Sequence, residues 1–488
     1  MSDFLLHAST WAVVTHVTVV AALSVRVIMN RPATGVALSW ILLILATPVF
    51  GSALYLMVGE RRIGRRRRAG FQGLRENYRR VAETAAVEGL TNIRWDDHTP
   101  GLRGMDQIGR RLVGFPTVRG SRHRLFSKTD EILQAIARDV DQAEFSVLME
   151  FYIWHPGGLA DDVLEALIHA AGRGVHCCVL IDALGARPWW KTDQPQRLRD
   201  AGVQLHAALP VGLFRTFVGR TDLRLHRKIV VVDGHIAWTG SMNLVDPRFF
   251  KQDAGVGQWV DSMARLEGSA VALLAAVFIG DWNLESGTPL AELVERAKLR
   301  LIEPDGPSDL QVIPSGPGQS GDAQLQMILT LLNTAREEIV LTTPYLVPDE
   351  SLLRAMNGAS ARGVTVRLIV PEKVDSFLTR YASRSYFQDM LDHDIEVYLY
   401  RDGLLHTKAI TVDGQHAMFG TVNLDMRSFW LNYEVALYIY DSNFAAEIRQ
   451  LQQTYLDDSD RLDPEQFAQR GFKERFLENS LRLASPLL

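Results

Sequence analysis

Two long apolar stretches lie at the beginning of the chain. Residues 36–58 contain no charged side chain, and these 23 positions are enough for one helix to cross a hydrocarbon core of about 30 Å. Residues 4–25 also lack Asp, Glu, Lys and Arg, and Arg26 follows them, where a long cationic side chain can reach the membrane surface. Only Asn30 to Gly35 separate the stretches. The pattern predicts a transmembrane hairpin in residues 1–58, with helices over 4–27 and 36–58.

Two other interpretations exist for these stretches: a cleaved signal peptide for the first and a buried core helix for the second. No basic region precedes the first stretch and no clear A-x-A site follows it, and core helices seldom run so long without a charge. His7 and His16 make the first stretch less apolar, and Pro48 and Gly51 can kink the second. The membrane hairpin is the interpretation that the pattern favours.

From about residue 125 the chain alternates amphipathic helical segments with short β-branched segments, which is typical of an α/β protein. The order strand, helix, strand occurs over 143–182 and again over 336–371, and both helices end in Arg-Gly, at Gly174 and Gly363, where glycine caps a helix well. We therefore expect a duplicated body of two lobes, each a mixed, mainly parallel sheet flanked by helices.

The segments around the two copies complete the predicted domain plan. Residues 59–124 form a polar, Arg-rich helical connector, and residues 287–320 are rich in Gly, Pro and Ser, which is typical of a linker. The first lobe then spans 125–286 and the second 321–488.

Charge is distributed unevenly along the chain. Residues 1–70 hold eight Arg and two acids, so the formal charge of −5 for the whole chain leaves −11 for residues 71–488. By the positive-inside rule, the cluster RRIGRRRR at 61–68 assigns both ends of the hairpin to the cytoplasm. The acidic body opposes a general nucleic-acid binder, which needs a basic face. Cys177 and Cys178 are adjacent, offer no disulfide framework or metal spacing, and are expected to be structural.

Each copy ends in the same arrangement of chemically active residues, H-x-K-x4-D-G-x5-G-[ST]-x-N. The motif residues are His226, Lys228, Asp233, Gly240, Ser241 and Asn243 in the first copy and His406, Lys408, Asp413, Gly420, Thr421 and Asn423 in the second. Two such matches inside a repeat are not a chance event. Lysine stands at the second motif position in both copies although only 8 of the 52 basic residues are Lys.

The alternation of side chains along a strand sorts these residues by face. Each motif His shares a face with its Lys, whereas Asp233 and Asp413 have the opposite parity and precede Gly, so they more naturally brace a turn or an ion pair than touch a substrate. The hydroxyl and amide groups, again two residues apart, can bind a substrate phosphate; these residues are Ser241, Asn243, Thr421 and Asn423.

Two imidazoles and two ammonium groups without a carboxylate cage fit a phosphodiester substrate. Its oxygens gain charge when phosphorus is attacked, and fixed cationic and amide donors stabilise that charge. One His can attack phosphorus while the other protonates the departing alkoxide and later deprotonates the incoming alcohol. This chemistry needs no metal, nucleotide or other cofactor.

Both histidines need a partner for the second ring nitrogen. Asp261 follows the first motif and Glu434 follows the second at a similar distance, which makes them the candidate orienting residues. The alternative is that both are ordinary surface or strand-end acids.

The paired motifs resemble the duplicated HKD signature of the phospholipase D superfamily, and the flanks TDLRLHRKIVVVDG, GSMNLVDPRFFKQDAGVGQWVD and GTVNLDMRSFWLNYEV resemble its bacterial cardiolipin synthase branch. The resemblance covers essentially the whole chain. It implies one active site between two pseudo-symmetric phospholipase D-like lobes, a phosphatidyl-histidine intermediate, and phosphatidyl transfer between two phosphatidylglycerol molecules with release of glycerol. It favours His226 as the nucleophile and His406 as the general acid and base, although the motifs themselves are too alike to decide.

The same resemblance implies an enzyme of the bacterial cytoplasmic membrane, with the catalytic body on the cytoplasmic side and phospholipid partners rather than nucleic acid. Whether the chain dimerises stays open. A hydrolytic phospholipase D acting on other phospholipids, a membrane-tethered nucleic-acid phosphodiesterase and a non-enzymatic lipid-binding scaffold are the competing hypotheses.

Several other features suggest lipid contact. The segment 209–219 can dip into a membrane interface, or it can pack under a loop. A set of aromatic residues can line an acyl path or belong to the core: Trp189, Trp190, Phe249, Phe250, Phe429 and Trp430.

Overall fold

The computed structural model describes residues 2–32, 34–60, 65–210, 220, 222–299, 301–318 and 322–483. The chain divides into two compact units: Met1–Arg68 with Val211–Asp222, and Ala69–Pro210 with Leu223–Leu488. Both copies of the motif lie in the second unit. Each unit is described by itself below.

The first unit is helical over both apolar stretches. Its helices are α1 (Ser2–Met29), α2 (Thr34–Ala46) and α3 (Pro48–Leu54), followed by a short π-helix η1 (Tyr55–Gly59). The second predicted helix is broken because Pro48, at the start of α3, cannot donate a backbone hydrogen bond to the preceding turn. Arg26 forms an ion pair with Glu60 (Nε–Oε1 2.5 Å), which fixes the end of α1 against the segment after η1.

The helices of the first unit differ from the predicted pair of membrane-crossing helices. Among the helices of the described residues, none has both the length and the apolar character needed to cross a membrane. With 13 residues, α2 extends about 20 Å at 1.5 Å per residue, less than the thickness of a hydrocarbon core. Residues 61–64 of the Arg cluster lie outside the described residues, and the helix α4 (Arg65–Val87) begins within the cluster.

One mixed sheet of 16 strands runs through both lobes of the second unit. Lobe 1 contributes β1 (Val118–Phe126), β2 (Ser146–Phe151), β3 (His176–Asp182), β4 (Gln204–Ala208), β6 (Ile229–Val232), β7 (Ile236–Gly240) and β9 (Met263–Gly268). Lobe 2 contributes β10 (Ser308–Ser315), β11 (Glu338–Thr342), β13 (Thr365–Pro371), β14 (Glu396–Tyr400), β16 (Ala409–Val412), β17 (His416–Gly420), β19 (Asn432–Ile439) and β20 (Ser459–Arg461). The two-residue strand β5 (Arg224–Leu225) also belongs to this sheet, through β19. Two separate small sheets are formed by β8 (Trp259–Val260) with β15 (Leu404–Leu405) and by β12 (Leu346–Val347) with β18 (Leu424–Asp425).

The strand order reveals the duplication. From one edge, β4-β3-β2-β6-β7-β9 repeats as β14-β13-β11-β16-β17-β19 from the other, and the antiparallel pair β1–β10 joins the two halves in the middle. The predicted strand, helix, strand units are present in both lobes, as β2-α7-β3 with α7 at Leu159–Gly172 and as β11-α12-β13 with α12 at Glu350–Ala361. Gly174 and Gly363 have φ of 89° and 87°, the left-handed conformation expected after a helix end.

The prediction of a mainly parallel sheet is wrong. Among the described residues of the main sheet, the parallel pairs are β2–β3–β4, β11–β13–β14 and the short pair β5–β19, and the other pairs are antiparallel. Helices join the strands of the first two parallel sets, whereas the motif strands β6 and β16 continue through the tight turns at Asp233-Gly234 and Asp413-Gly414, which force antiparallel hairpins.

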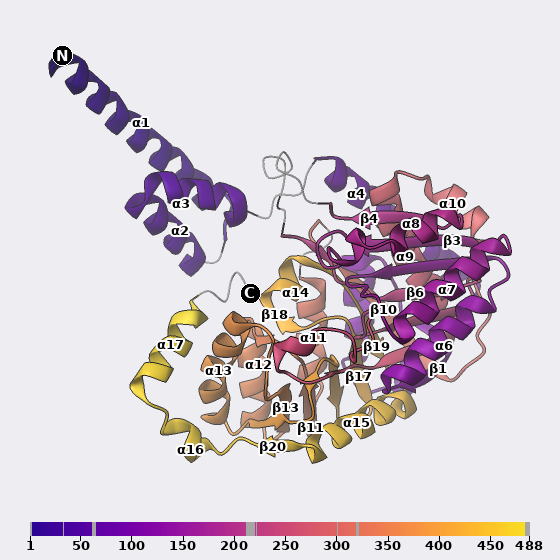
Figure 1. The fold of residues 1–488 in the computed structure, drawn as a ribbon. Helices are drawn as coiled ribbons and strands as arrows, with labels where there is room; N and C mark the ends of the chain where they lie inside the picture. Colours follow the sequence, from indigo (N-terminus) through magenta and orange to yellow (C-terminus); the bar gives the residue numbers. More distant parts are fainter. Residues whose placement is uncertain are drawn as a thin grey trace. The chain divides into compact units, whose positions relative to one another are not determined.

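The segment predicted as a linker, 287–320, contains the helix α10 (Leu290–Arg296) and the central strand β10. Ser308, Pro314 and Ser315 lie within this strand, which pairs with β1 and β19. The other helices of the second unit are α5 (Leu102–Ile108), α6 (Thr129–Asp141), α8 (Gln194–Asp200), α9 (Ala270–Ser286), α11 (Ala323–Asn333), α13 (Phe377–Leu391), α14 (Met426–Trp430), α15 (Ser442–Asp457), α16 (Pro464–Ala468) and α17 (Phe472–Arg482). Figure 1 shows α12 and α13 on one side of the lobe 2 strands and α15 on the other.

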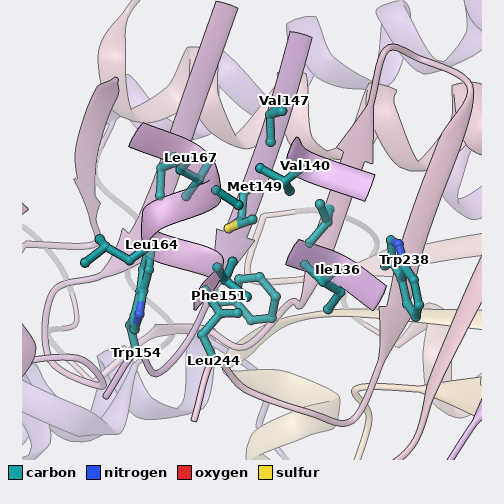
Figure 2. Close-up of a cluster of buried hydrophobic side chains, with 14 of the residues drawn as sticks. Ile136, Val140, Val147, Met149, Phe151, Trp154, Leu164, Leu167, Trp238 and Leu244 are labelled. Carbon is teal, nitrogen blue, oxygen red and sulfur yellow. The ribbon is translucent and has the colours of Figure 1, made fainter. Parts of the chain in front are cut away.

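The core of lobe 1 lies between β2 and the helices α6 and α7. Alternate residues of β2 point toward these helices, and Figure 2 shows them meeting Leu164 and Leu167 of α7 and Ile136 and Val140 of α6; the β2 residues are Val147, Met149 and Phe151. The remaining β2 side chains face α9, so the whole strand is buried. This explains why the strand is a continuous apolar segment except at Ser146 and Glu150.

Truncation of this core is expected to destabilise the protein. Leu167 is fully buried, so Leu167→Ala should lower the free energy of unfolding by about 2–5 kcal/mol through lost transfer energy and a cavity. Chemical denaturation measures this value, with Leu184→Ala, at a residue that is 39% exposed, as a control that should cost about 1 kcal/mol or less. Equal losses in the two variants would contradict the packing described.

Candidate active site

Each motif histidine is reached through a strand that pairs with the other lobe. The lead-in strand β5 pairs in parallel with the start of β19, and β15 pairs in parallel with β8. As a result, the backbone N–H of His226 donates to the carbonyl of Tyr433 (2.9 Å) and that of His406 to the carbonyl of Val260 (2.8 Å). The two motifs therefore enter the boundary between the lobes from opposite sides.

The same pairing brings the two candidate carboxylates to the histidines, in a crossed arrangement. Nδ1 of His226 lies 2.8 Å from Oε2 of Glu434, and Nδ1 of His406 lies 2.7 Å from Oδ1 of Asp261. Each histidine is thus oriented by the lobe that does not carry it. Sequence distance alone could not assign the partners, because each carboxylate follows the motif of its own lobe.

Burial determines the protonation of these groups. Burial lowers the pKa of both His226 and His406 to about 4, against the opposing effect of their carboxylate partners. Burial alone would raise the pKa of the Asp261 and Glu434 carboxyls, but the neighbouring histidine and lysine outweigh it and lower both values. At neutral pH the imidazoles are neutral and the carboxylates ionised, so Nδ1–H donates to the carboxylate and Nε2 keeps its lone pair.

Both motif lysines are fully buried beside their histidines. Nζ of Lys228 donates to the carbonyl of His226 (2.6 Å), and Nζ of Lys408 donates to that of His406 (2.5 Å). Burial lowers the pKa of Lys228 to about 8 and that of Lys408 well below its ordinary value. Each ammonium group has further donors available, because an ammonium carries three N–H groups.

The hydroxyl groups predicted to bind phosphate donate to the orienting carboxylates. Oγ of Ser241 donates to Oδ1 of Asp261 (2.6 Å), and Oγ1 of Thr421 donates to Oε2 of Glu434 (2.5 Å). Each histidine therefore belongs to a hydrogen-bonded series of hydroxyl, carboxylate and imidazole. In both series the hydroxyl and the carboxylate come from the same lobe, which keeps the series rigid.

The buried amides Asn243 and Asn423 lie beside these hydrogen-bonded series. Oδ1 of Asn243 accepts the backbone N–H of Ile153 (3.1 Å), which turns its amide N–H₂ group away from that strand. A phosphate contact of either amide remains a prediction.

The motif aspartates brace the sheet away from the histidines. The carboxylate of Asp233 accepts the backbone N–H groups of residues 144–146 at 2.7–2.9 Å, and that of Asp413 accepts those of residues 336–338, with shortest distances of 2.8–3.0 Å. Both have positive φ, of 53° and 52°. This geometry agrees with their strand parity and assigns them to the turn that starts the neighbouring strand, although the motif alone lists them with the catalytic residues.

Sequence reasoning missed three residues at the site. The ring centroids of Trp259 and His406 lie 4.3 Å apart, and the rings of Tyr152 and His226 make an edge contact with their centroids 5.2 Å apart. Arg227 is buried behind the motif, pairs with Asp281 and donates to the carbonyl of Glu434 (3.0 Å). Strand parity could have indicated Trp259, two residues before Asp261.

The two lobes differ behind the histidines. Arg227 and Asp281 lie near Glu150, and burial together with the charge of Asp281 raises the pKa of Glu150 well above its ordinary value. In lobe 2 the position after His406 is Thr407, which makes a neutral hydrogen bond to Tyr455 (3.0 Å). The duplication therefore preserves the reacting groups and varies their support.

The weaker sequence indications fall into separate groups. Trp189 is buried and stacks on Trp154 in the core, while Phe249 is 53% exposed and Phe250 packs on Trp259 with ring centroids 5.1 Å apart. Residues 211–219 of the predicted interfacial segment lie outside the described residues. Both cysteines are buried, which raises the pKa of each to about 12 and fits a structural role; these are Cys177 and Cys178.

Comparison with known proteins agrees with this geometry. The family described as "Cardiolipin synthase, PLD-like domain" matches residues 136–282 and 328–455, one segment in each lobe, and a family described as phospholipase D-nuclease N-terminal matches residues 17–60. The chain is 40% identical over 481 residues to cardiolipin synthase A of Serratia proteamaculans and 41% identical over 469 residues to cardiolipin synthase A of Yersinia pseudotuberculosis, with 96% of both chains covered in each case.

A solved structure shows the same fold. The crystal structure of phosphatidylserine synthase from Haemophilus influenzae superposes with a TM-score of 0.58 at 16% identity and covers 79% of this chain and 100% of that one. The duplicated sheet, the crossed histidine–carboxylate pairs and the near full-length relatives lead to one conclusion: the chain belongs to the cardiolipin synthase family with phospholipase D-like domains.

Proposed function

We propose that the protein is a cardiolipin synthase, a phosphatidyltransferase that joins two phosphatidylglycerol molecules and releases glycerol. The observation that carries this proposal is the crossed pair of neutral histidines, each with Nδ1 on a carboxylate and Nε2 free. A double displacement at phosphorus needs two such groups on opposite sides of one phosphodiester. The relatives in Serratia and Yersinia bear the name of this activity.

The first half-reaction forms the covalent intermediate. Nε2 of His226 attacks phosphorus of the first phosphatidylglycerol, and the bond from phosphorus to the glycerol oxygen breaks. His406 first binds a proton from the solvent at Nε2, because the anionic phosphate that enters between the histidines raises its pKa, and it then gives this proton to the departing glycerol oxygen. Glu434 stabilises the positive charge that develops on the phosphorylated imidazole of His226.

The second half-reaction repeats these steps in reverse order. A glycerol hydroxyl of the second phosphatidylglycerol gives its proton to His406, and its oxygen attacks phosphorus of the phosphatidyl-histidine. The bond from phosphorus to Nε2 breaks, cardiolipin forms, and His226 is neutral again. Asp261 holds His406 in the tautomer that both steps require.

The side chains around the histidines neutralise the negative charge of the phosphate oxygens. Lys228 and Lys408 supply two buried cations, and Asn243 and Asn423 supply amide donors to the non-bridging oxygens. Ser241 and Thr421 act through Asp261 and Glu434, to which they donate. In this scheme the hydroxyls position the carboxylates rather than the phosphate.

The membrane placement belongs to this proposal as well. Phosphatidylglycerol is a membrane lipid, so we place the enzyme at the bacterial cytoplasmic membrane, with the residue 1–58 hairpin as its anchor and the lobes on the cytoplasmic side. The arginines at 61–68 favour that side. The alternative is a phospholipase D, in which water replaces the second lipid at the same site.

Product analysis distinguishes these activities. Purified protein supplied with phosphatidylglycerol should form cardiolipin and glycerol in equal amounts, and His226→Ala and His406→Ala should each lower turnover by about 10³-fold or more. Mass spectrometry of the lipids and an assay of released glycerol measure both products. Phosphatidic acid without cardiolipin would identify a hydrolase instead, and full turnover in both variants would refute the mechanism.

The two orienting carboxylates should affect different chemical steps. Asp261→Asn impairs the general acid, so its loss in the rate of the first half-reaction, measured as the burst of p-nitrophenol, should shrink on a substrate with a good leaving group, such as phosphatidyl-p-nitrophenol, which leaves without a proton. Glu434→Gln impairs the nucleophile, so its loss of about 10²- to 10⁴-fold should be similar on both substrates. The opposite pattern would assign attack to His406. His226→Ala and His406→Ala, measured on both substrates, are the matched controls for these two variants.

Acid should destabilise the folded protein before it stops the chemistry. Histidine has an ordinary pKa near 6.5 and the buried His226, His406 and His416 have pKa values of about 4, so the unfolded chain binds more protons between these values and stability falls as the pH falls. Each group contributes up to about 1.4 kcal/mol per pH unit. The midpoint of thermal unfolding should fall when the pH is lowered from 7.0 to 5.0. The fall should be smaller in His416→Gln, which lacks one of these histidines at a position outside the site. An unchanged midpoint would contradict this.

A further inference from the structure

Helix α17 turns its charged side toward the protein and its apolar side outward. The buried residue among Phe472–Arg482 is Glu478. Phe472 and Phe476 are 81% and 64% exposed. A surface helix that only covers a core has the opposite arrangement, with its apolar stripe inward. The outward aromatic stripe therefore needs a partner that the lobe itself does not supply.

Ion pairs hold the inward side of α17 against α13. Glu478 accepts from Nε of Arg384 (2.8 Å) and pairs with Arg470, and Glu474 accepts from NH2 of Arg384 (2.8 Å). Arg482 pairs with Asp389 (2.7 Å). Positions 474, 478 and 482 form one side of a helix, and positions 472 and 476 lie about 200° around from it. Figure 1 shows α17 beside α13 at the outside of lobe 2.

The chain enters α17 from the second half of α13. NH2 of Arg470, just before α17, donates to Oε1 of Gln388 (3.4 Å), and β20, which leads to α16 and α17, runs antiparallel to β14. The first residues of α13, at the other end of that helix, are also exposed and apolar, with Phe377 at 61% and Leu378 at 46%. The helix pair therefore carries two apolar sets, one on each helix.

A short series of contacts connects the beginning of α13 to the active site. Asp375, two residues before α13, accepts from Oη of Tyr345 (2.7 Å) and from Nζ of Lys251 (2.8 Å). Nζ of Lys251 lies 5.4 Å from the ring centroid of Trp259, and Trp259 packs on His406. The exposed beginning of α13 thus adjoins the boundary between the lobes, where His406 lies.

The charges beside the aromatic residues are basic. Lys473 and Arg475 flank Phe472 and Phe476 and are exposed, and neither has an ion pair within the part of the chain that the structure describes. The acidic neighbour Glu474 is already paired with Arg384. Exposed aromatic residues beside lysine and arginine are the composition of an interfacial helix on anionic lipid.

We infer that the outward apolar residues of α17 and α13 dock on an anionic phospholipid surface and that the beginning of α13 brings its headgroups to the active site. A second copy of the chain fits less well, because a symmetric contact would bring like charges together and because a stable dimer needs about 800 Å² per partner. The inference rests on the proposed function in one respect, namely that the substrate is a membrane lipid. The docking residues are Phe377, Leu378, Phe472, Phe476, Lys473 and Arg475.

A fluorophore placed on α17 tests this inference in the full chain. Cys177 and Cys178 are buried, so an environment-sensitive thiol label reacts with Phe476→Cys alone. On vesicles of phosphatidylcholine with phosphatidylglycerol, its emission should shift to the blue and iodide should quench it several-fold less. Val87→Cys, at an apolar residue that is 84% exposed on α4, is the matched control and should stay accessible.

The activity assay gives a second, independent measurement. Phe472→Ser with Phe476→Ser should lower activity on phosphatidylglycerol vesicles about tenfold or more but leave activity on detergent-dispersed lipid unchanged. Val87→Ser should change neither. His226→Ala, which removes catalysis, should still show iodide protection, so a failed catalytic proposal and a failed docking proposal give different results.

Three outcomes would overturn the inference. Full quenching by iodide on the anionic vesicles would show that α17 stays in water, and equal protection on pure phosphatidylcholine would show that the surface need not be anionic. An emission shift that appears without lipid and grows with protein concentration would identify a second copy as the occupant.

Discussion

The structure depends on a reciprocal contact: each lobe supplies the carboxylate that orients the histidine of the other. The short pairings of β5 with β19 and of β15 with β8 set this register, because each lead-in strand ends one residue before a histidine and its partner strand runs into a carboxylate. A shift of one residue in either pairing would turn His226 or His406 away from its partner. Neither lobe could therefore form a complete catalytic group alone, and the site exists only when both are folded together.

Burying two lysines, two histidines and two carboxylates costs desolvation energy, and the geometry offsets it by giving these groups polar partners. Lys228 and Lys408 donate to the carbonyls of their own motifs, and Ser241 and Thr421 donate to the carboxylates. Removing one member of such a network leaves a buried charge without its partner, which costs more than the intact network gains. This explains why the same residue types recur in both copies although the rest of the lobes has diverged.

Duplication left the two halves chemically unequal. Behind His226 stand Arg227, Asp281 and Glu150, whose pKa is raised by burial, whereas Thr407 and Tyr455 stand behind His406. The flanking aromatic residues also differ: the rings of Tyr152 and His226 meet at a steep angle, and the Trp259 ring packs against the His406 ring at a smaller one. An indole against an imidazole favours the cationic form of that ring, which suits a group that holds and returns a proton. The asymmetry thus agrees with attack by His226 and proton transfer by His406.

The sequence by itself determined the duplication and the two motifs, because periodicity and strand parity are local properties. It also predicted that Asp233 and Asp413 brace a turn, and it named Asp261 and Glu434 as partners for the histidines. It could not determine that the carboxylates cross between lobes, that Ser241 and Thr421 donate to them, or that Trp259 packs on His406. It erred on the parallel sheet, where hairpins at the motif turns override the strand–helix–strand signal, and its second apolar helix is broken at Pro48. The crossed contacts join residues more than a hundred positions apart, and only the tertiary structure decides which distant strands meet.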